Sequence, residues 1–226
     1  MPFLAALLKP RSVIDVGCGT AEWLAAFAEH GAAHIVGVDG DYVPRQMLKI
    51  PEESFLPYDL EEPLHIDKRF DLAVSLEVAE HLSPERGEAF VEELTALGET
   101  VLFSAAIPVQ AEPIWGHVNE RWQGYWAGLF EEQGYERVDC VRGRFWEDTR
   151  VPFWYRQNTI LYVSTDSLRR NRKLLDECET HAGFPLSVAH PEMAPVSGGV
   201  VQWMLGEERK KRRQLRRKLQ RIKGQA

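Results

Sequence analysis

The chain has 226 residues, of which 44% are hydrophobic and 10% aromatic, a composition typical of a folded globular protein rather than a disordered one. No apolar run approaches the roughly 18 residues that a membrane-spanning helix needs. The opening MPFLAALLKP is too short for a signal peptide and lacks its basic first segment. The three cysteines match no zinc-site spacing and give no disulfide framework. We therefore expect a cytoplasmic protein without a membrane span.

The net charge of −7 is unevenly distributed along the chain. The segment 207–223 holds ten Lys and Arg residues against two Glu, and the rest of the chain has 17 basic and 32 acidic residues. An acidic body repels phosphates, so a nucleic-acid partner is not expected. The basic tail favours a solvated helix that contacts the body, a second copy of the chain in a homodimer, or an acidic partner. We divide the chain into a domain at 1–165, an extension at 166–206 and the tail at 207–226.

Short β-branched runs alternate with helical patterns along the chain, which is typical of a parallel sheet built from βαβ units. In chain order the patterns predict a strand at 12–17, a helix at 21–31, a strand at 34–40, a short helix at 43–50, strands at 54–60 and 70–76, a helix from there to about residue 97, a strand at 100–107, a helix at 123–134, strands at 136–143 and 159–165, and a helix near 167–180. The predicted fold class is α/β: a seven-stranded, mostly parallel sheet with helices on both faces and a helical C-terminal extension.

A glycine-rich turn, GCGT at 17–20, follows the first predicted strand. Such a turn lets the backbone approach a ligand closely, and the next helix presents its N-terminal amides there. Alone the pattern is weak, because a dinucleotide fingerprint wants a third glycine. Asp39 closes the second strand, where a carboxylate can accept from a ribose diol, and Asp59 closes the third, where an adenine amino group could bind. Taken singly, either aspartate could equally cap a helix.

The succession VIDVGCGTAEW, VGVDGD, LPYDL, FDLAVSLEVAEHL and VLFSAAI resembles the class I S-adenosylmethionine-dependent methyltransferases in order and spacing, over residues 11–165. The resemblance implies a Rossmann-like fold and S-adenosylmethionine as cofactor, with Asp39 at its ribose and Asp59 at its adenine. Ala21 departs from the third glycine of many members, and only about ten residues precede the first strand. The cofactor-binding residues so implied are Asp15, Gly17, Cys18, Gly19, Trp23, Asp39, Gly40, Asp59, Leu60 and Leu76.

The stretch SLEVAEHL at 75–82 places two carboxylates and an imidazole at the end of the fourth predicted strand. Glu77 is expected on the lip of the crevice, with Glu80 and His81 at i+3 and i+4 on one face of the first turn of a helix. His117 lies in the segment IWGHVNERW, in the loop after the fifth strand. Two glutamates and two histidines suit Mg²⁺, Mn²⁺, Fe²⁺ or Zn²⁺ in an open site with room for substrate oxygens.

This set resembles two branches of the same superfamily: small-RNA terminal 2′-O-methyltransferases, with a Glu-x-x-Glu-His motif, and ubiquinone-pathway catechol O-methyltransferases, with an EVxEH stretch. The resemblance implies that a divalent ion on Glu77, Glu80, His81 and His117, which are also the catalytic candidates, binds two substrate oxygens and lowers the pKa of one hydroxyl before in-line methyl transfer. Two alternatives stay open. His117 acts as a metal-free general base, or Glu80 and His81 only cap the helix or pack against the cofactor.

The stretches GHVNERW and RFWEDTRVPFWYRQNT resemble bacterial methyltransferases of polysaccharide or secondary-metabolite assembly. This resemblance implies O-methylation of a small, hydroxyl-rich acceptor such as a sugar or glycoside, although any single tryptophan favours a core position. Alternatives are N-methylation of an amino sugar or amino acid derivative, 2′-O-methylation of RNA gripped by the basic tail, and a non-catalytic cofactor-binding partner. The candidate substrate contacts are Asn119, Glu120, Trp122, Tyr155, Arg156 and Asn158.

Overall fold

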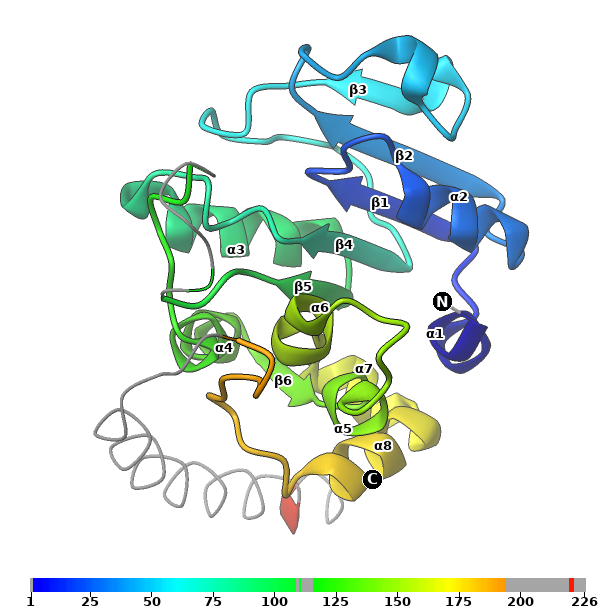
Figure 1. The fold of residues 1–226 in the computed structure, drawn as a ribbon. Coiled ribbons are helices and arrows are strands. Elements are labelled where there is room, and N and C mark those ends of the chain that lie inside the picture. The colour runs from blue at the N-terminus through cyan, green and yellow to red at the C-terminus, as the bar shows by residue number, and fades with distance from the viewer. Residues whose placement is uncertain (1, 109, 111–115, 194–219, 222–226) are drawn as a thin grey trace.

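The computed structural model describes residues 2–108, 110, 116–193 and 220–221. Its strands form one seven-stranded sheet in the order β3-β2-β1-β4-β5-β7-β6 (Figure 1). β7 runs antiparallel to its neighbours β5 and β6, and the other pairs are parallel. The predicted seven-stranded, mostly parallel sheet is therefore confirmed. The strands are β1 (Ser12–Val16), β2 (His34–Asp39), β3 (Phe55–Pro57), β4 (Leu72–Leu76), β5 (Thr100–Ser104), β6 (Tyr135–Val138) and β7 (Ile160–Ser164).

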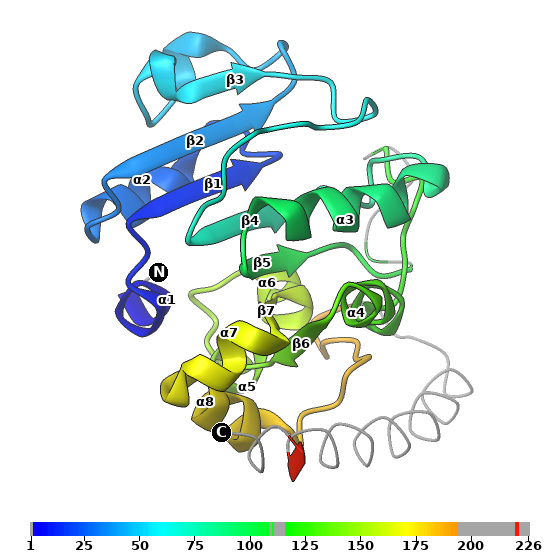
Figure 2. The same cartoon turned by 180° about the vertical axis from the view of Figure 1, so that it is seen from behind.

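Helices cover both faces of the sheet, because alternate strand residues point to opposite faces and each face buries its own apolar cluster. Val13 of β1 packs in the cluster under α1, α2, α7 and α8, whereas Ile14 packs in the cluster under α3 and α4 (Figures 1 and 2). α5 and α6 lie in the connection between β6 and β7. The helices are α1 (Pro2–Leu8), α2 (Glu22–Glu29), α3 (Gly87–Leu97), α4 (Gln123–Glu132), α5 (Arg142–Phe145), α6 (Phe153–Asn158), α7 (Thr165–Arg170) and α8 (Arg172–His181).

The strand order reverses between β1 and β4, and this reversal decides where a ligand can bind. β1 pairs with β2 on one side and with β4 on the other, so the connections that follow these strands diverge to opposite sides of the sheet. In open α/β sheets a crevice forms beyond the carboxyl ends of the strands at such a point. The glycine turn after β1 and the SLEVAEHL stretch after β4 both lie there.

The structure corrects the predicted helix that follows β4. Instead of entering a helix, Glu77 adopts a left-handed conformation with φ +57°, and the amide of His81 donates to the carbonyl of Val78 in a turn. A 3-10 turn at Pro84–Arg86 then precedes α3, which begins at Gly87. Residues 77–83 form bends and turns, so Glu80 and His81 are in a loop.

Other boundaries also differ from the prediction. The helix expected at 43–50 is a single 3-10 turn at Arg45–Met47, preceded by an extended proline. Strand β3 ends at Pro57, since the next residues form a turn in which the Asp59 carboxylate accepts from the amide of Glu61. The strand expected at 100–107 ends at residue 104, and that expected at 136–143 ends at residue 138.

The two ends of the described chain carry helices that the patterns did not predict in this form. α1 precedes the first strand and was not expected. The helix expected near 167–180 is divided at Asn171, whose side chain caps α8 by accepting from the Leu174 amide. Leu168 of α7 and Leu175 of α8 pack in the same core cluster as β1.

The division into domains stays a prediction. The extension at 166–206 is described as far as residue 193, and the tail at 207–226 lies outside the described residues except for 220 and 221. The tail's expected contacts with a partner or a second copy also fall there. Within the described part of the chain, no helix has the length and apolarity needed to cross a bilayer.

Candidate active site

A cleft of about 1050 Å³ opens beyond the carboxyl ends of β1, β2 and β4. Its lining also includes Tyr42, Tyr58, Val78 and Leu82, which the sequence reasoning missed. Each of these four residues lies within three positions of a predicted site residue. Closeness in sequence to those residues is the signal that could have indicated them. The predicted residues that line the cleft are Gly17, Gly19, Asp39, Gly40, Asp59, Leu60, Glu77 and His81.

The glycine turn brings backbone to the floor of this cleft. Gly17 has φ +81°, and a Cβ added there would lie 2.3 Å from Cγ2 of Val78. The amides of Gly17 and Cys18 both donate to the carbonyl of Val38, at 2.8 and 3.1 Å. Only glycine combines this backbone conformation with so close a neighbour, so Gly17 is required by the turn itself.

Asp39 connects the ends of β1 and β2. Its carboxylate accepts from the amide of Gly19 at 2.7 Å, from the amide of Gly40 at 2.7 Å and from the hydroxyl of Tyr42 at 2.6 Å. Asp39 is 5% exposed, whereas Tyr42 is 82% exposed. The Asp39 carboxylate therefore already accepts a hydrogen bond from the Tyr42 hydroxyl. A ligand hydroxyl could take that place, because Tyr42 can move into solvent.

Three of the expected cofactor residues do not line the cleft. Trp23 and Leu76 line a second, apolar cavity. The Cys18 side chain is buried beneath Gly37, where an added Cβ would lie 2.8 Å from its sulfur. Cofactor binding by these three residues stays a prediction, and their side chains lie outside the lining of the cleft.

Asp15 is also absent from the cleft lining and lies under the glycine turn. It is 1% exposed, and its Oδ2 has no hydrogen-bond partner among the described residues. Burial, with smaller contributions from Asp39 and Glu22, raises the pKa of Asp15 from 3.8 to about 8. The folded protein therefore favours a neutral Asp15.

Asp15→Asn is expected to stabilise the protein, and the gain should grow as the pH rises. Below about pH 4 the carboxyl is protonated whether the chain is folded or unfolded, so the group costs nothing; between about 4 and 8 only the folded state keeps the proton. The gain should grow by about 1.4 kcal/mol per pH unit across this range and approach about 5 kcal/mol at pH 8. Urea unfolding at pH 5 and pH 8 measures it, with the exposed Asp67→Asn as control. A gain that shrinks toward pH 8 would contradict the assignment.

Glu80, His81 and His117 form the one group of potential metal ligands found among the described residues. One ligand atom from each lies within 4.8 Å of the others. The carbonyl of Glu80 accepts from the amides of Val118 and Asn119, at 2.8 and 3.0 Å, which places the loop after β5 against the loop after β4. The group is therefore assembled by backbone hydrogen bonds between two loops rather than by the face of a helix.

Glu80 is the buried member of this group. It is fully buried, and neither carboxylate oxygen has a hydrogen-bond partner within the described structure. Burial first, and then the neighbouring Glu77, raises the pKa of Glu80 well above its usual range. An unpartnered buried carboxylate is costly unless it is protonated or coordinates a cation.

The two imidazoles are oriented by their Nδ1 atoms. His117 Nδ1 lies 2.9 Å from Glu120 Oε1, and His81 Nδ1 lies 3.4 Å from the carbonyl of Gly116. The rings pack edge to face with centroids 4.8 Å apart. Burial, with His117 as a smaller cause, lowers the pKa of His81. Both rings thus have Nε2 free of these contacts, and metal-binding histidines are commonly held in this way through the other nitrogen.

Glu77 was expected as a fourth ligand, but the structure engages its carboxylate elsewhere. It accepts from Gln110 at 2.9 Å and from Asn158 at 3.2 Å, and its amide donates to the side chain of Ser104 at 3.1 Å. Burial raises the pKa of Glu77, against the opposing effect of these hydrogen bonds. Glu77 lies outside the Glu80, His81 and His117 group and contributes instead to the wall of the cleft.

Of the three expected substrate contacts after β5, two make contacts within the protein. Asn119 is buried, and its side-chain oxygen accepts from Arg121 at 3.0 Å, so the prediction that it contacts substrate is not supported. Glu120 orients His117 instead of facing substrate by itself. Trp122 is half-buried immediately before α4.

The expected contacts on α6 are also engaged. Arg156 is 2% exposed and donates to the carboxylate of Glu192 at 2.7 Å, and the Asn158 amide donates to Glu77. Tyr155 packs edge to face on Trp23, with centroids 5.3 Å apart. Substrate contact by Arg156 and Asn158 stays a prediction, since their polar groups are paired with Glu192 and Glu77 in this structure.

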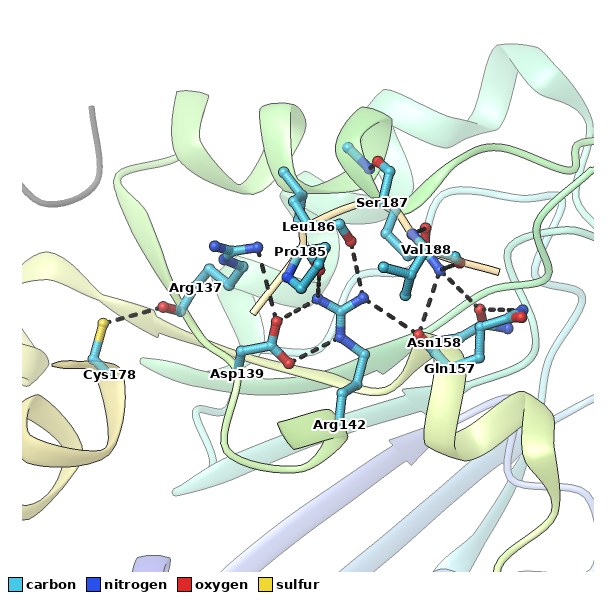
Figure 3. A network of polar contacts seen from close by, with 12 residues as sticks. Arg137, Asp139, Arg142, Gln157, Asn158, Cys178, Pro185, Leu186, Ser187 and Val188 are labelled. Carbon is cyan, nitrogen blue, oxygen red and sulfur yellow. Dashed lines mark hydrogen bonds and ion pairs between the residues drawn. The ribbon is translucent and has the colours of Figure 1, made fainter. Parts of the chain in front are cut away.

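The buried Arg142 holds α6 against that later segment (Figure 3). It pairs with Asp139 through two hydrogen bonds, and donates to the carbonyls of Pro185 and Leu186 at 2.9 Å each and of Gln157 at 3.3 Å. These contacts satisfy the guanidinium away from water. They also fix the end of α6, where the side-chain amide of Asn158 donates to Glu77.

The sequence matches a family model described as a methyltransferase domain over residues 1–139, more than half of the chain. The chain belongs to this family. It is accordingly an S-adenosylmethionine-dependent methyltransferase, as the motif order implied. Comparison with curated proteins gives no match.

Solved methyltransferase structures share the fold. An O-methyltransferase family protein from Burkholderia thailandensis has a TM-score of 0.52 at 12% identity, over 72% of this chain and only 55% of that chain. The methyltransferase domain of bacterial CtHen1-C has a TM-score of 0.52 at 20% identity, over 72% and 95%. Magnesium protoporphyrin IX methyltransferase from Synechocystis PCC 6803, with bound SAH, has a TM-score of 0.51 at 16% identity, over 72% and 79%. These likenesses concern the fold alone.

Proposed function

We propose that this methyltransferase transfers the methyl group of S-adenosylmethionine to a hydroxyl of a small polyhydroxylated acceptor, such as a sugar or a glycoside. The grouping of Glu80, His81 and His117 beside the cleft carries the proposal, since His81 belongs both to the group and to the cleft lining. A hydroxyl is a poor nucleophile until its proton is removed or its pKa is lowered. The group offers residues that can do either.

We assign the cleft beyond β1, β2 and β4 to the methyl donor, S-adenosylmethionine, and call it the donor cleft. In it, Asp39 is assigned to the ribose hydroxyls and the glycine turn to the methionine part. The Tyr42 hydroxyl, which donates to Asp39 at 2.6 Å, shows the kind of O–H group that this carboxylate accepts at the cleft. Asp59 and Leu60 line the same cleft and are assigned to adenine. Asp15, which is buried two residues before the turn, is assigned to the methionine side.

The residues present fit a divalent cation. Glu80 supplies an unpartnered buried carboxylate, and His81 and His117 supply Nε2 atoms oriented through their Nδ1 contacts. A set of two imidazoles and one carboxylate suits Fe²⁺, Mn²⁺ or Zn²⁺. When bound, such a cation lowers the pKa of an acceptor hydroxyl and orients two neighbouring oxygens. Vicinal hydroxyls are common to sugars and catechols.

A metal-free version of the same transfer is favoured by one contact. The 2.9 Å distance from His117 Nδ1 to Glu120 Oε1 is that of a hydrogen bond that orients an imidazole. His117 Nε2 would then accept the proton of the acceptor hydroxyl. N-methylation of an amino sugar or amino acid derivative would need a neutral amine and a base, but no cation. RNA 2′-O-methylation is disfavoured because the chain outside the tail has 32 Asp and Glu residues but only 17 Lys and Arg residues. Such an acidic body repels the RNA phosphates.

A transfer assay separates these versions. Chelated protein is supplied with S-adenosylmethionine and one of three acceptors: a catechol, a methyl glycoside with vicinal hydroxyls, or an amino sugar. S-adenosylhomocysteine release and product mass are measured before and after Mg²⁺, Mn²⁺ or Zn²⁺ is restored. We expect methylation of a vicinal hydroxyl that depends on one of the cations. Transfer unaffected by chelation would favour His117 as base, and methylation at nitrogen alone would contradict O-transfer.

A further inference from the structure

The turn that follows β3 belongs to the donor cleft, although most of it is exposed to solvent. Asp59 and Leu60 line the cleft, and the amide of Glu62 donates to the carbonyl of Asp59 at 3.0 Å, which closes the turn. We call this segment the 59–62 turn. Residues 58–69 include neither helix nor strand. Regular secondary structure therefore does not hold the turn, and other contacts must fix where its side chains lie.

Arg86 holds the backbone of the 59–62 turn. Its guanidinium donates to the carbonyl of Leu60 from Nε at 3.2 Å and from Nη2 at 3.1 Å, and to the carbonyl of Glu62 at 3.2 Å. It also pairs with both carboxylate oxygens of Glu93 in α3, at 3.0 and 2.8 Å. The side chains of this pair are each 11% exposed, so water competes little with these bonds. The planar guanidinium thus joins the turn to α3.

A second contact comes from the 3-10 turn that contains Arg86. The amide and the hydroxyl of Ser83 donate to the two carboxylate oxygens of Glu61, at 2.7 and 2.8 Å. The amide of Arg86 donates to the carbonyl of Ser83 at 2.9 Å, so both contacts arise from one local structure. Pro84 fixes a backbone angle in it and limits its freedom. The 59–62 turn is therefore held at its backbone and at one of its side chains.

We propose that Arg86 is a positioning residue for the base of the donor: it holds the 59–62 turn so that Asp59 accepts from the adenine amino group. A carboxylate on an exposed turn selects a hydrogen-bond donor only when the turn holds it in one direction. Oδ1 of Asp59 accepts from the amide of Glu61 at 3.0 Å, so we assign Oδ2 to the base. Arg86 is absent from the described lining of the cleft and acts through the turn. The inference rests on the proposed placement of adenine at Asp59 and Leu60.

Two ligands test the inference: S-adenosylhomocysteine and its purine analogue, which lacks the 6-amino group. Calorimetric titration of the full chain gives the affinity for each ligand, and the ratio of the two affinities is the base preference. We expect the wild type to prefer S-adenosylhomocysteine by about tenfold, as one hydrogen bond to a charged group predicts. A turn that is not held should lose part of this preference.

Arg86→Lys keeps the charge beside Glu93 but loses the planar fork, so it should reduce the base preference to about threefold. Glu93→Gln removes the charge that orients the guanidinium and should lower the preference in the same direction. A general loosening of the cleft would instead weaken both ligands by the same factor. Equal weakening of both ligands in Arg86→Lys, with the preference unchanged, would overturn the inference.

Two further variants separate this inference from the placement of adenine. Arg144→Lys changes an arginine that also donates to both oxygens of one glutamate but lies outside the described lining of the cleft, and should leave the preference unchanged. Asp59→Asn keeps the oxygen that accepts from Glu61, replaces the other with an NH2 group, and should abolish the preference. An unchanged preference in Asp59→Asn would overturn the placement of adenine together with the inference. Loss in Asp59→Asn but not in Arg86→Lys would overturn the inference alone.

Discussion

Gly17→Ala is expected to weaken S-adenosylhomocysteine binding by about 100-fold and to lower the free energy of unfolding by about 3 kcal/mol. The added Cβ would lie 2.3 Å from Cγ2 and 2.7 Å from Cγ1 of Val78, at a backbone with φ +81°. Both residues line the donor cleft, so any relaxation that separates them changes the shape of the cleft. Calorimetric titration and urea unfolding measure the two effects.

The stability part of this prediction has a matched control in the same turn. Gly19 also has a positive φ, +53°, but a Cβ there would meet no atom within 4 Å. Gly19→Ala should therefore cost only the left-handed backbone, about 1 kcal/mol. Adding Val78→Ala to Gly17→Ala should recover part of the lost stability, since it removes the atoms that clash. Equal destabilisation by the two glycine substitutions would show that contact with Val78 is not the cause.

Glu80→Gln is expected to reduce divalent-cation affinity and turnover by about 100-fold or more, while S-adenosylhomocysteine affinity stays within about twofold. The substitution keeps the shape of a fully buried side chain and removes its capacity for charge. The fold should be retained, because neither oxygen of Glu80 has a partner to lose among the described residues. Calorimetry with Mn²⁺ and Zn²⁺ in the presence of S-adenosylhomocysteine, and the transfer assay, measure these changes.

Proton release provides a second signature of the same site. Because burial raises the pKa of Glu80 well above its usual range, a cation that binds there must displace the carboxyl proton. Cation affinity of the wild type should rise with pH, and titrations in buffers of different ionisation enthalpy should show proton release. Glu88→Gln, an exposed substitution on α3, should change neither quantity. Wild-type cation affinity in Glu80→Gln would remove Glu80 from the site, whereas absence of cation binding to the wild type would leave His117 or His81 as a metal-free base.

Much of the fold could be predicted from the sequence, because its signals are local. Strand β1 and the turn at Gly17 follow from a β-branched run and a glycine pattern, and the order of such runs is sufficient to indicate a doubly covered parallel sheet. The positions of Asp39 and Asp59 at successive strand ends likewise predicted their place in the cleft, since parallel strands end at one edge. Neither inference requires knowledge of a distant contact.

The sequence predicted which residues form the group of potential metal ligands at Glu80, His81 and His117, but not how the chain brings them together. A helix was expected at Glu77, yet left-handed backbone there places Glu80 and His81 in a loop, where backbone contacts with the 117–119 loop bring His117 beside them. Glu77, the fourth expected ligand, lies outside the group of three, and its carboxylate accepts from Gln110 and Asn158. Contacts between residues separated by 33 and 81 positions leave no periodic signal in the sequence.

The sequence by itself determined the sheet, the donor cleft and the family, because alternating strands, turn glycines and strand-end carboxylates act within a few residues of their neighbours. Tertiary structure alone decided which polar side chains remain free for a ligand. From the sequence, Arg156 and Asn158 were expected to contact substrate, but in the structure they donate to Glu192 and Glu77. Glu80, in contrast, has two buried oxygens without partners among the described residues. Burial and pairing depend on the whole packed chain, and for buried polar groups they determine which ones can do chemistry.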